Sequence, residues 1–396
     1  MTDPHLNRRF FLKSAALIGC SAAAHPLLSS MTFAALPGDN RLVVIILRGA
    51  MDGLDVIQPY GDPMLAKLRQ KLSVGPDKGA LDLNGFYALH PRLQPLMPLW
   101  QKGELAFAHA VSTPYRDKRS HFDGQDLLEA GTGNDLPVDR RIGGWLNRML
   151  QALPGARAET AYSVGVEQMR ILSGEAAHLS WAPRVSLRLS PQAQLLLEHV
   201  YHDDPLFRDA ARDAAQISAD SPTMDKEQPG PTADVRALGA FAASRLNGES
   251  RIAAFSIVGW DSHATQEAVL GRALDRLAAA ILALRDGLGP NWARTTVLAM
   301  TEFGRTVREN GSAGTDHGTG GALLMAGGAI RGGRAYGDWP GLGEDQLYAG
   351  RDLMPTRDVR AYAAWAMRGL FGTGQDVLER SIFPGLDLGD DPGILG

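Results

Sequence analysis

The hydrophobic pattern of this chain alternates between two kinds of segment. Short, uninterrupted apolar runs rich in β-branched residues are typical of strands buried on both faces, as in the middle of a parallel sheet. The clearest run, Arg41 to Leu47, ends in a turn that contains Gly49 and Gly53. The pattern predicts strands at 41–47, 105–111, 251–258, 295–300 and 321–326.

Between these strands, polar and apolar residues follow a helical spacing. Apolar positions recur every three or four residues from Thr265 to Leu288, and a last amphipathic helix is predicted from Thr356 to about Leu370. Ser120 and Asp123 match a capping box, so a helix is expected to begin near Ser120. Strands that alternate with helices predict an α/β fold with a mainly parallel central sheet flanked by helices.

One segment lacks either periodicity. Residues 218–234 are rich in Ser, Pro, Asp and Gly, and we expect an exposed loop there between the two halves of the domain. No tandem repeat of 20–50 residues is found. The chain from residue 35 to residue 396 is therefore predicted to form a single α/β domain.

The N-terminal segment has the order of an export signal. Arg8 and Arg9 are followed by Phe-Phe-Leu-Lys, by an apolar stretch of small residues, and by further small residues. The adjacent arginines specify the twin-arginine route. We predict a signal peptide over residues 1–34, recognition by the twin-arginine translocase, and a periplasmic location. The apolar stretch is shorter than the ~20 residues that span a bilayer, and no later run is long enough.

A lipoprotein signal is the alternative interpretation. Leu17-Ile18-Gly19-Cys20 fits a lipoprotein cleavage box, and Cys20 is the only cysteine in the chain. If cleavage instead falls near Ala34, the mature protein has no thiol and forms no disulfide. Its stability then comes from its core alone.

Charge narrows the class of partner. The formal net charge is −4, and because residues 1–34 carry +2, the mature part carries −6. A mildly acidic protein without basic blocks is a poor candidate for a general nucleic-acid binder.

Candidate chemistry gathers where the predicted strands end. In an open α/β sheet, sites form at the carboxyl ends of the strands. Three strand ends and one following loop carry side chains that bind metal ions, which predicts a polar functional cleft. These residues are Asp52, Asp261, His263, Glu302, Asp316 and His317.

Carboxylates and neutral imidazoles suit a divalent ion such as zinc, manganese or calcium. The Asp261-x-His263 spacing places both side chains on the same side of an extended backbone, so both are expected to face one ion. Each residue also has a structural interpretation. Asp52 can stabilise a turn, Asp316 can cap a glycine loop, and the histidines can be hydrogen-bonded parts of the framework.

Ser120 is the candidate nucleophile, because a helix start holds anionic groups such as phosphate or sulfate. A simple N-cap role is the alternative. Arg305, and Arg116 before Ser120, are candidates for binding a tetrahedral oxyanion through two hydrogen bonds. Thr113 is a weaker candidate nucleophile. His121 follows Ser120, but neighbours on a helix do not face the same way, so His121 is left out of the predicted site.

Several stretches together resemble the DUF1501 family, a large group of uncharacterised bacterial proteins. The resemblance spans nearly the whole mature chain. The matching stretches include Leu47-Arg48-Gly49-Ala50-Met51-Asp52-Gly53-Leu54, Leu89-His90-Pro91, Arg119-Ser120-His121-Phe122, Gly259-Trp260-Asp261-Ser262-His263, Thr301-Glu302-Phe303-Gly304-Arg305 and Asp316-His317-Gly318.

This group looks like a remote branch of the alkaline phosphatase and sulfatase superfamily. That resemblance implies an alkaline-phosphatase-like α/β core, two divalent metals and Ser120 as nucleophile. It also implies metal ligands at Asp52, Asp261, His263 and His317, with Asp316 a weaker candidate. The sequence departs from the superfamily where many members carry Asp-His: Glu302 stands there without an adjacent histidine, and no formylglycine signature occurs.

Two functions follow from these observations. The leading hypothesis is an exported metal-dependent hydrolase that acts on a small or polymeric anionic ester of phosphate or sulfate. The alternative is a non-catalytic periplasmic protein on the same fold that binds a glycan, an anionic polymer or a partner protein. In that case stacking faces for sugars are expected from Trp145, Trp181, Trp260 and Trp339.

Overall fold

The structure is a computed structural model. It does not describe all the segments for which the sequence makes a prediction. The predicted signal peptide with Cys20 and most of the predicted loop at 218–234 lie outside the described residues. Only the end of that loop is described, and there Ala233 and Asp234 already begin a helix, so the predicted loop extends too far. The structure describes residues 38–72, 74–116, 118–133, 143–165, 169–181 and 230–396.

The main element is a nine-stranded sheet with the order β11-β5-β10-β9-β1-β8-β6-β7, in which β12 also pairs with β5. All its strand pairs are parallel except those that β10 makes with β5 and β9. The predicted mainly parallel sheet is confirmed. The strands are β1 (Arg41–Arg48), β5 (Leu105–Ser112), β6 (Ala161–Val164), β7 (Leu179–Trp181), β8 (Ile252–Val258), β9 (Thr295–Thr301), β10 (Gly321–Ala326), β11 (Arg334–Tyr336) and β12 (Arg357–Asp358).

A smaller three-stranded sheet has the order β2-β4-β3 and is antiparallel. Its strands are only two residues long: β2 (Ile57–Gln58), β3 (Leu81–Asp82) and β4 (Ala88–Leu89).

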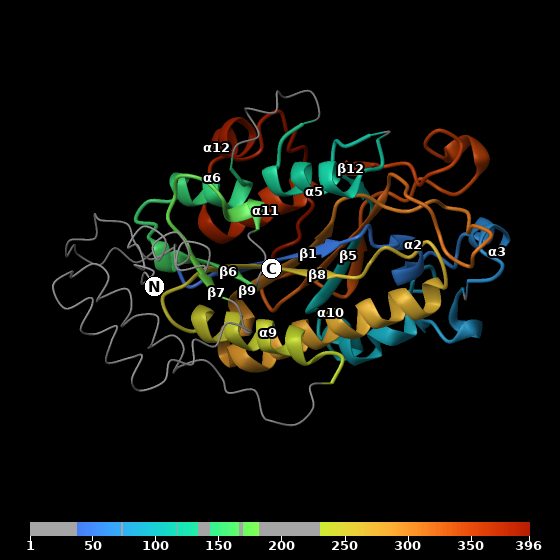
Figure 1. Cartoon of the computed structure of the whole chain (residues 1–396), viewed down its shortest axis with the longest axis horizontal. Helices are drawn as coiled ribbons and strands as arrows, with labels where there is room; N and C mark the ends of the chain where they lie inside the picture. Colours follow the sequence, from blue (N-terminus) through green and yellow to red (C-terminus); the bar gives the residue numbers. More distant parts are fainter. Residues whose placement is uncertain (1–37, 73, 117, 134–142, 166–168, 182–229) are drawn as a thin grey trace, which may run out of the picture. The chain divides into compact units, whose positions relative to one another are not determined.

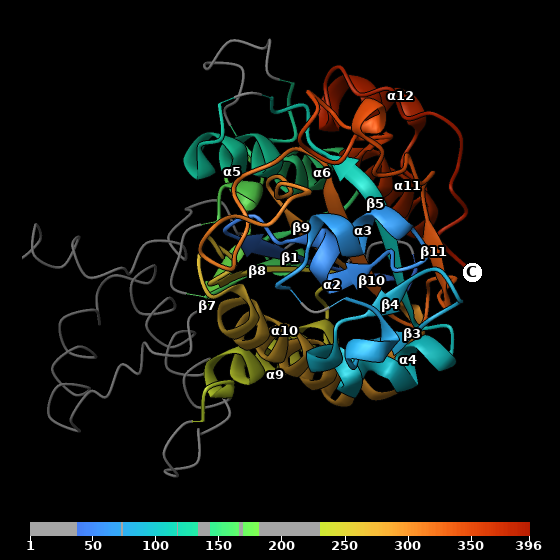
Figure 2. The same cartoon turned by 90° about the vertical axis from the view of Figure 1, so that its right-hand side faces the viewer.

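Helices cover both faces of the large sheet (Figures 1 and 2). One face carries α9 and α10, and the other carries α5, α6 and α11. The α-helices are α2 (Gly53–Val56), α3 (Pro63–Leu68), α4 (Met97–Gln101), α5 (His121–Ala130), α6 (Trp145–Ala152), α9 (Ala233–Leu246), α10 (Gln266–Leu288), α11 (Val359–Phe371) and α12 (Gln375–Val377).

Shorter helical turns join these elements. They are η1 (Pro76–Lys78), η2 (Pro91–Leu96), η4 (Ala158–Thr160), η5 (Arg170–Leu172), η6 (Gly289–Arg294), η7 (Glu344–Gln346) and η8 (Leu378–Ile382).

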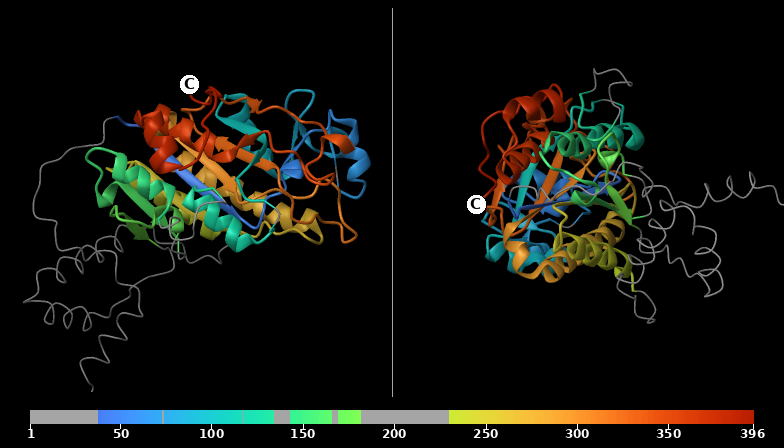
Figure 3. Two further views of the ribbon diagram at one scale, coloured as in Figure 1. Left: turned by 90° about the horizontal axis from the view of Figure 1, so that it is seen from above. Right: turned by 90° about the vertical axis from the view of Figure 1, so that its left-hand side faces the viewer.

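The central strand β1 shows why the sequence has an uninterrupted apolar run. Val43, Ile45 and Leu47 belong to the core beneath α9 and α10, whereas Leu42 and Val44 belong to the core beneath α6 and α11. Successive side chains of a strand point to opposite faces, so the middle of a strand covered on both sides is expected to be a nearly continuous apolar run. Seen along the sheet, the helical layers lie on either side of it (Figure 3).

The two helices of one face pack closely because a glycine lies between them. A Cβ on Gly239 of α9 would lie 2.7 Å from the carbonyl oxygen of Ala280 in α10, closer than any real side chain comes. A larger residue there would push the helices apart. Among the described residues, no helix is both long enough and apolar enough to cross a membrane.

The strand arrangement determines where polar side chains meet. β1, β8 and β9 are parallel neighbours, so the segments that follow Arg48, Val258 and Thr301 leave the sheet at the same edge. β10 is antiparallel and therefore begins at this edge. The predicted helix at 356–370 begins later than expected, at Val359, because Arg357 and Asp358 pair with β5 as strand β12.

Candidate metal centre

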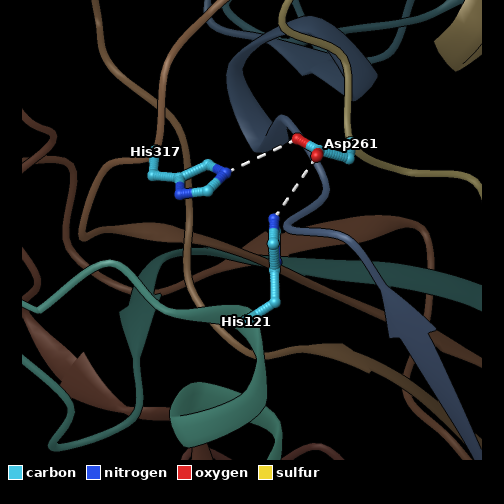
Figure 4. A group of neighbouring side chains, drawn as sticks. All are labelled: His121, Asp261 and His317. Carbon is cyan, nitrogen blue, oxygen red and sulfur yellow. Dashed lines mark ion pairs between the residues drawn. The ribbon is translucent and has the colours of Figure 1, made fainter.

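Three side chains from distant parts of the chain meet at this edge of the sheet (Figure 4). His121 is the first residue of α5, Asp261 follows β8, and His317 lies in the loop between β9 and β10. One ligand atom of each lies within 4.8 Å of the others. Asp261 is in the middle: its carboxylate oxygens are 3.6 Å from His121 Nε2 and 3.5 Å from His317 Nε2.

Glu302 fixes the orientation of His121. Its Oε1 lies 2.7 Å from His121 Nδ1 and also accepts hydrogen bonds from the Gly49 amide at 2.9 Å and from Gln125 Nε2 at 3.0 Å. Burial by itself would raise the pKa of Glu302, but the hydrogen bonds from His121 and Gln125 outweigh it and lower that pKa. An ionised carboxylate only accepts, so the proton is on Nδ1 of His121.

The consequence is an unsatisfied nitrogen. With Nδ1 donating to Glu302, Nε2 of His121 faces Asp261, and in the neutral imidazole this nitrogen carries the lone pair. This Nε2 is buried and has no hydrogen-bond partner among the described residues. Buried polar atoms are rarely left unpaired, and each exception needs an explanation.

His317 is oriented in the same way. Its Nδ1 lies 2.9 Å from the backbone oxygen of Arg119, and since a carbonyl only accepts, Nδ1 carries the proton. Nε2 then presents its lone pair to the same space. Burial is the main cause that lowers the pKa of His317, which favours this neutral form. A histidine ligand typically has its second nitrogen held by a carboxylate or a backbone carbonyl.

Arg305 holds the third member of the group. Its Nη2 lies 2.5 Å from Asp261 Oδ1, and the guanidinium is 1% exposed. Burial raises the pKa of Asp261, but the hydrogen bond and charge of Arg305, together with the charges of His263 and His121, lower it below its ordinary value, which favours the ionised carboxylate. The other donors of Arg305 bond the backbone oxygens of Gly49, Ala50 and Thr315. Arg305 therefore positions Asp261. The sequence predicted that Arg305 would bind an oxyanion, but in the structure its donors bond oxygens of the protein.

His263 and Asp316 form the exposed side of the group. His263 Nε2 is 3.2 Å from Asp261 Oδ1 and 2.9 Å from His317 Nε2, while its Nδ1 is 3.1 Å from Asp316 Oδ1. The expected approach of Asp261 and His263 is therefore seen.

Asp52 is not part of this group. Its carboxylate forms a buried ion pair with both terminal nitrogens of Arg69, at 2.7 and 3.0 Å, and accepts from Gln266 Nε2 at 2.6 Å. The same amide nitrogen donates to Asp55 at 2.8 Å. Burial, and then the charge of Asp52, raise the pKa of Asp55 to about 6. The expected role as a ligand gives way to a structural one, because Arg69 already neutralises Asp52.

Ser120 is the N-cap residue of α5. Its Oγ accepts from the Asp123 amide at 3.4 Å, and its own amide donates to the Tyr115 hydroxyl at 2.7 Å. Ser120 lies between Arg119, whose carbonyl holds His317, and His121, so it borders the group directly. Thr113 is buried and its hydroxyl donates to the Glu302 carbonyl at 3.2 Å, which leaves Ser120 as the stronger candidate nucleophile.

His121 is the residue that sequence reasoning missed. Neighbours on a helix face different ways, but Ser120 is not helical: its φ of −97° and ψ of 122° are extended. The rule therefore does not apply to this pair. The signal that would have found His121 is its place at the first helical position, next to the candidate nucleophile.

The tryptophans expected to stack on sugars mostly pack inside the protein. Trp145 and Trp260 are fully buried, and Trp181 stacks on Phe241 with ring centroids 3.7 Å apart. Trp339 is partly buried against the core and donates to Asp62.

A profile described as "Protein of unknown function (DUF1501)" matches residues 90–364, which is more than half of the chain. No curated protein gives a significant match.

Solved structures of the alkaline phosphatase superfamily and related proteins give distant matches. A protein of that superfamily from Vibrio parahaemolyticus is 11% identical, with 96% of this chain and 80% of that chain covered and a TM-score of 0.39. The lipoteichoic acid synthase LtaP from Listeria monocytogenes is 8% identical, covering 87% and 76%, with a TM-score of 0.38.

The C-terminal periplasmic domain of EcEptC from Escherichia coli, in complex with Zn, is 10% identical, covering 75% and 77%, with a TM-score of 0.34. Likenesses this distant do not transfer the role of any residue to this chain.

The geometry makes a prediction about protonation. In metal-free protein, the hydrogen bond to Glu302 raises the pKa of His121 above its ordinary value, whereas burial lowers that of His317. As the pH rises, His317 should therefore lose its proton first. Nitrogen NMR of 15N-histidine-labelled protein measures both values. Glu302→Gln should lower the pKa of His121 and leave that of the remote His178 unchanged; an unchanged His121 would contradict the pairing.

Proposed function

The chain belongs to the DUF1501 family, and we propose that it is a metal-dependent hydrolase of phosphate or sulfate esters. One observation carries the proposal. The Nε2 atoms of His121 and His317 both face the carboxylate of Asp261, with one ligand atom of each residue within 4.8 Å of the others. Two imidazole nitrogens and a carboxylate that converge in this way fit a divalent cation, which would take the place of protons on these nitrogens.

The donor set identifies the residues that would hold the ion. His121, Asp261 and His317 are the ligands, and His263 lies within reach at the exposed side. Two imidazoles and a carboxylate suit zinc or manganese, whereas calcium prefers oxygen ligands only. A bound divalent ion supplies charge neutralisation for the ester and lowers the pKa of water.

The chain's own residues prepare this chemistry. Arg305 helps to keep Asp261 ionised and in place, and Glu302 holds Nδ1 of His121 so that Nε2 faces Asp261. Arg351 donates to the backbone oxygen of His317 and is paired with the buried Asp352 at 3.0 Å, so it helps to hold the loop that carries His317.

We assign the attack on the ester to the Ser120 hydroxyl. Ser120 lies between Arg119 and His121, at the positive end of the α5 dipole, where negative charge on the attacked group is stabilised. The Tyr115 hydroxyl contacts both the amide and the side chain of Ser120 and restricts its position.

A non-catalytic binding protein remains the second candidate function, and two observations favour it. The Ser120 hydroxyl already accepts the Asp123 amide, and the donors of Arg305 are bonded to protein oxygens. Both candidates use the same fold, but only the hydrolase requires the metal centre. The behaviour of Ser120 separates them.

Metal binding is tested by elemental analysis of the purified protein. Asp261→Asn should remove nearly all of a stoichiometric zinc, manganese or calcium content, because it deletes the central carboxylate charge. Asp275→Asn is the matched control, since Asp275 forms an exposed pair with Arg92 and should leave the metal content unchanged. Equal metal in both variants, or none in the wild type after incubation with these ions, would refute the proposed centre.

The nucleophile is tested with Ser120→Asn on a panel of phosphate and sulfate monoesters. Asparagine is as good an N-cap as serine, so α5 and the metal content should be retained, while Ser120→Ala costs about 1 kcal/mol of stability. Loss of the hydroxyl should lower kcat by at least about a thousandfold, as removal of a nucleophile does. Turnover that survives in Ser120→Asn would exclude Ser120, and a wild type inactive on every ester would favour the binding protein.

We also propose that the protein is exported by the twin-arginine route, on the basis of Arg8-Arg9 and the apolar stretch that follows. Replacement of both arginines by lysine retains the charge but removes the twin-arginine signature. Cell fractionation should then find the protein in the cytoplasm. Cys20→Ala is the control for lipidation, and continued export of the double-lysine variant would contradict the assigned route.

A further inference from the structure

A polar groove follows the carboxyl ends of β5 and β12, outside the group of candidate metal ligands. It consists of two adjoining cavities of about 550 and about 180 Å3. We call it the β5–β12 groove. Both cavities are lined by Pro114, Arg116, Thr356, Arg357 and Asp358.

The topology explains why a groove forms there. Ser112 and Asp358 are paired at the ends of two parallel strands, and the chain leaves the sheet after each of them. The C-terminal segment from Gly385 to Gly389 lines the larger cavity as well. Strand ends of this kind are where α/β proteins bind ligands.

A buried hydroxyl in the groove lacks a partner. Ser112 lines the smaller cavity, is 6% exposed, and its Oγ has no hydrogen-bond partner within the described part of the chain. A hydroxyl in this position destabilises the protein unless something bonds it. A ligand oxygen that reaches the smaller cavity would satisfy Ser112.

The charges around the groove favour an anion. Its lining carries three arginines against two aspartates, a formal net charge of +1. Arg360 neutralises Asp358 through contacts of 2.6 and 3.0 Å. Arg357 contacts backbone oxygens of the C-terminal segment and the Tyr362 ring, and no carboxylate partner is found for it among the described residues. The guanidinium of Arg357 is therefore held in place, and its positive charge can act on a bound anion.

A helix end adds to this field. α11 begins at Val359, directly after the groove residue Asp358, and its dipole places partial positive charge there. Asp358 caps this helix, but its own charge is offset by Arg360. The helix dipole and Arg357 therefore act together on the same space.

We propose that the β5–β12 groove binds the acidic group of a larger polar molecule, such as a sulfated, phosphorylated or carboxylated sugar. A volume of about 550 Å3 exceeds the needs of a lone ion and is typical of small-molecule sites. The acidic group bonds Arg357 and Ser112, and the rest of the molecule fills the larger cavity. None of these residues is a candidate metal ligand, so the site does not depend on the proposed hydrolysis.

The test is calorimetric titration of the full chain after chelation with EDTA, which removes any role of the metal centre. Three probes are compared at low salt: inorganic sulfate, a monosulfated disaccharide and its unsulfated parent. The sulfated disaccharide should bind more tightly than sulfate, the neutral one should not bind, and added salt should weaken the affinity. Equal binding of the neutral sugar, or no binding of any probe, would overturn the proposal.

Variants locate the site. Ser112→Ala and Arg357→Gln should each weaken binding at least about tenfold, as expected for a hydrogen bond to a charged group. Thr296→Val is the matched control, because Thr296 also has a buried unpaired hydroxyl but lies on β9, outside the groove lining. Circular dichroism confirms that Arg357→Gln is folded. Wild-type affinity in both groove variants would place any binding elsewhere and refute the assignment.

Discussion

The site depends on one buried cation. The guanidinium of Arg305 is almost fully enclosed and would be very costly to bury without partners. It therefore bonds the backbone oxygens of Gly49, Ala50 and Thr315 as well as Asp261. These bonds join the segments that follow β1 and β8 to the loop that carries His317. Without these hydrogen bonds the segments that follow the three strands would not be linked to one another, and Asp261 would not be held between the two histidines.

A second network of buried polar side chains adjoins the first. Arg69 and Asp52 form an enclosed ion pair, which Gln266 connects to Asp55. Breaking such a pair by removing one partner typically costs about 3–5 kcal/mol. The two networks meet at Thr315, whose carbonyl accepts from Arg305 and whose hydroxyl donates to Gln266. The loop that presents His317 is thus fixed from two sides.

Sequence patterns determined much of the framework of this protein. Runs that are mostly apolar identified β1, β5, β8, β9 and β10, because a strand covered on both faces has few polar positions. Ser120 was correctly predicted as a helix start, and the rule for strand ends brought Asp261, His263 and His317 to one place. The chain pattern does not encode strand direction, so the antiparallel orientation of β10 was not predicted.

Tertiary structure decided which of these residues belong together. Asp52 pairs with Arg69, the residue at the end of α3, and no local sequence pattern predicts that contact. His121 is oriented by a contact with Glu302, 181 positions away, and Arg305 donates a hydrogen bond to Asp261, 44 positions away. Local sequence determines the face or edge on which a side chain lies. Its partner, its charge state and its free lone pair are determined by packing between segments that only the folded chain brings together.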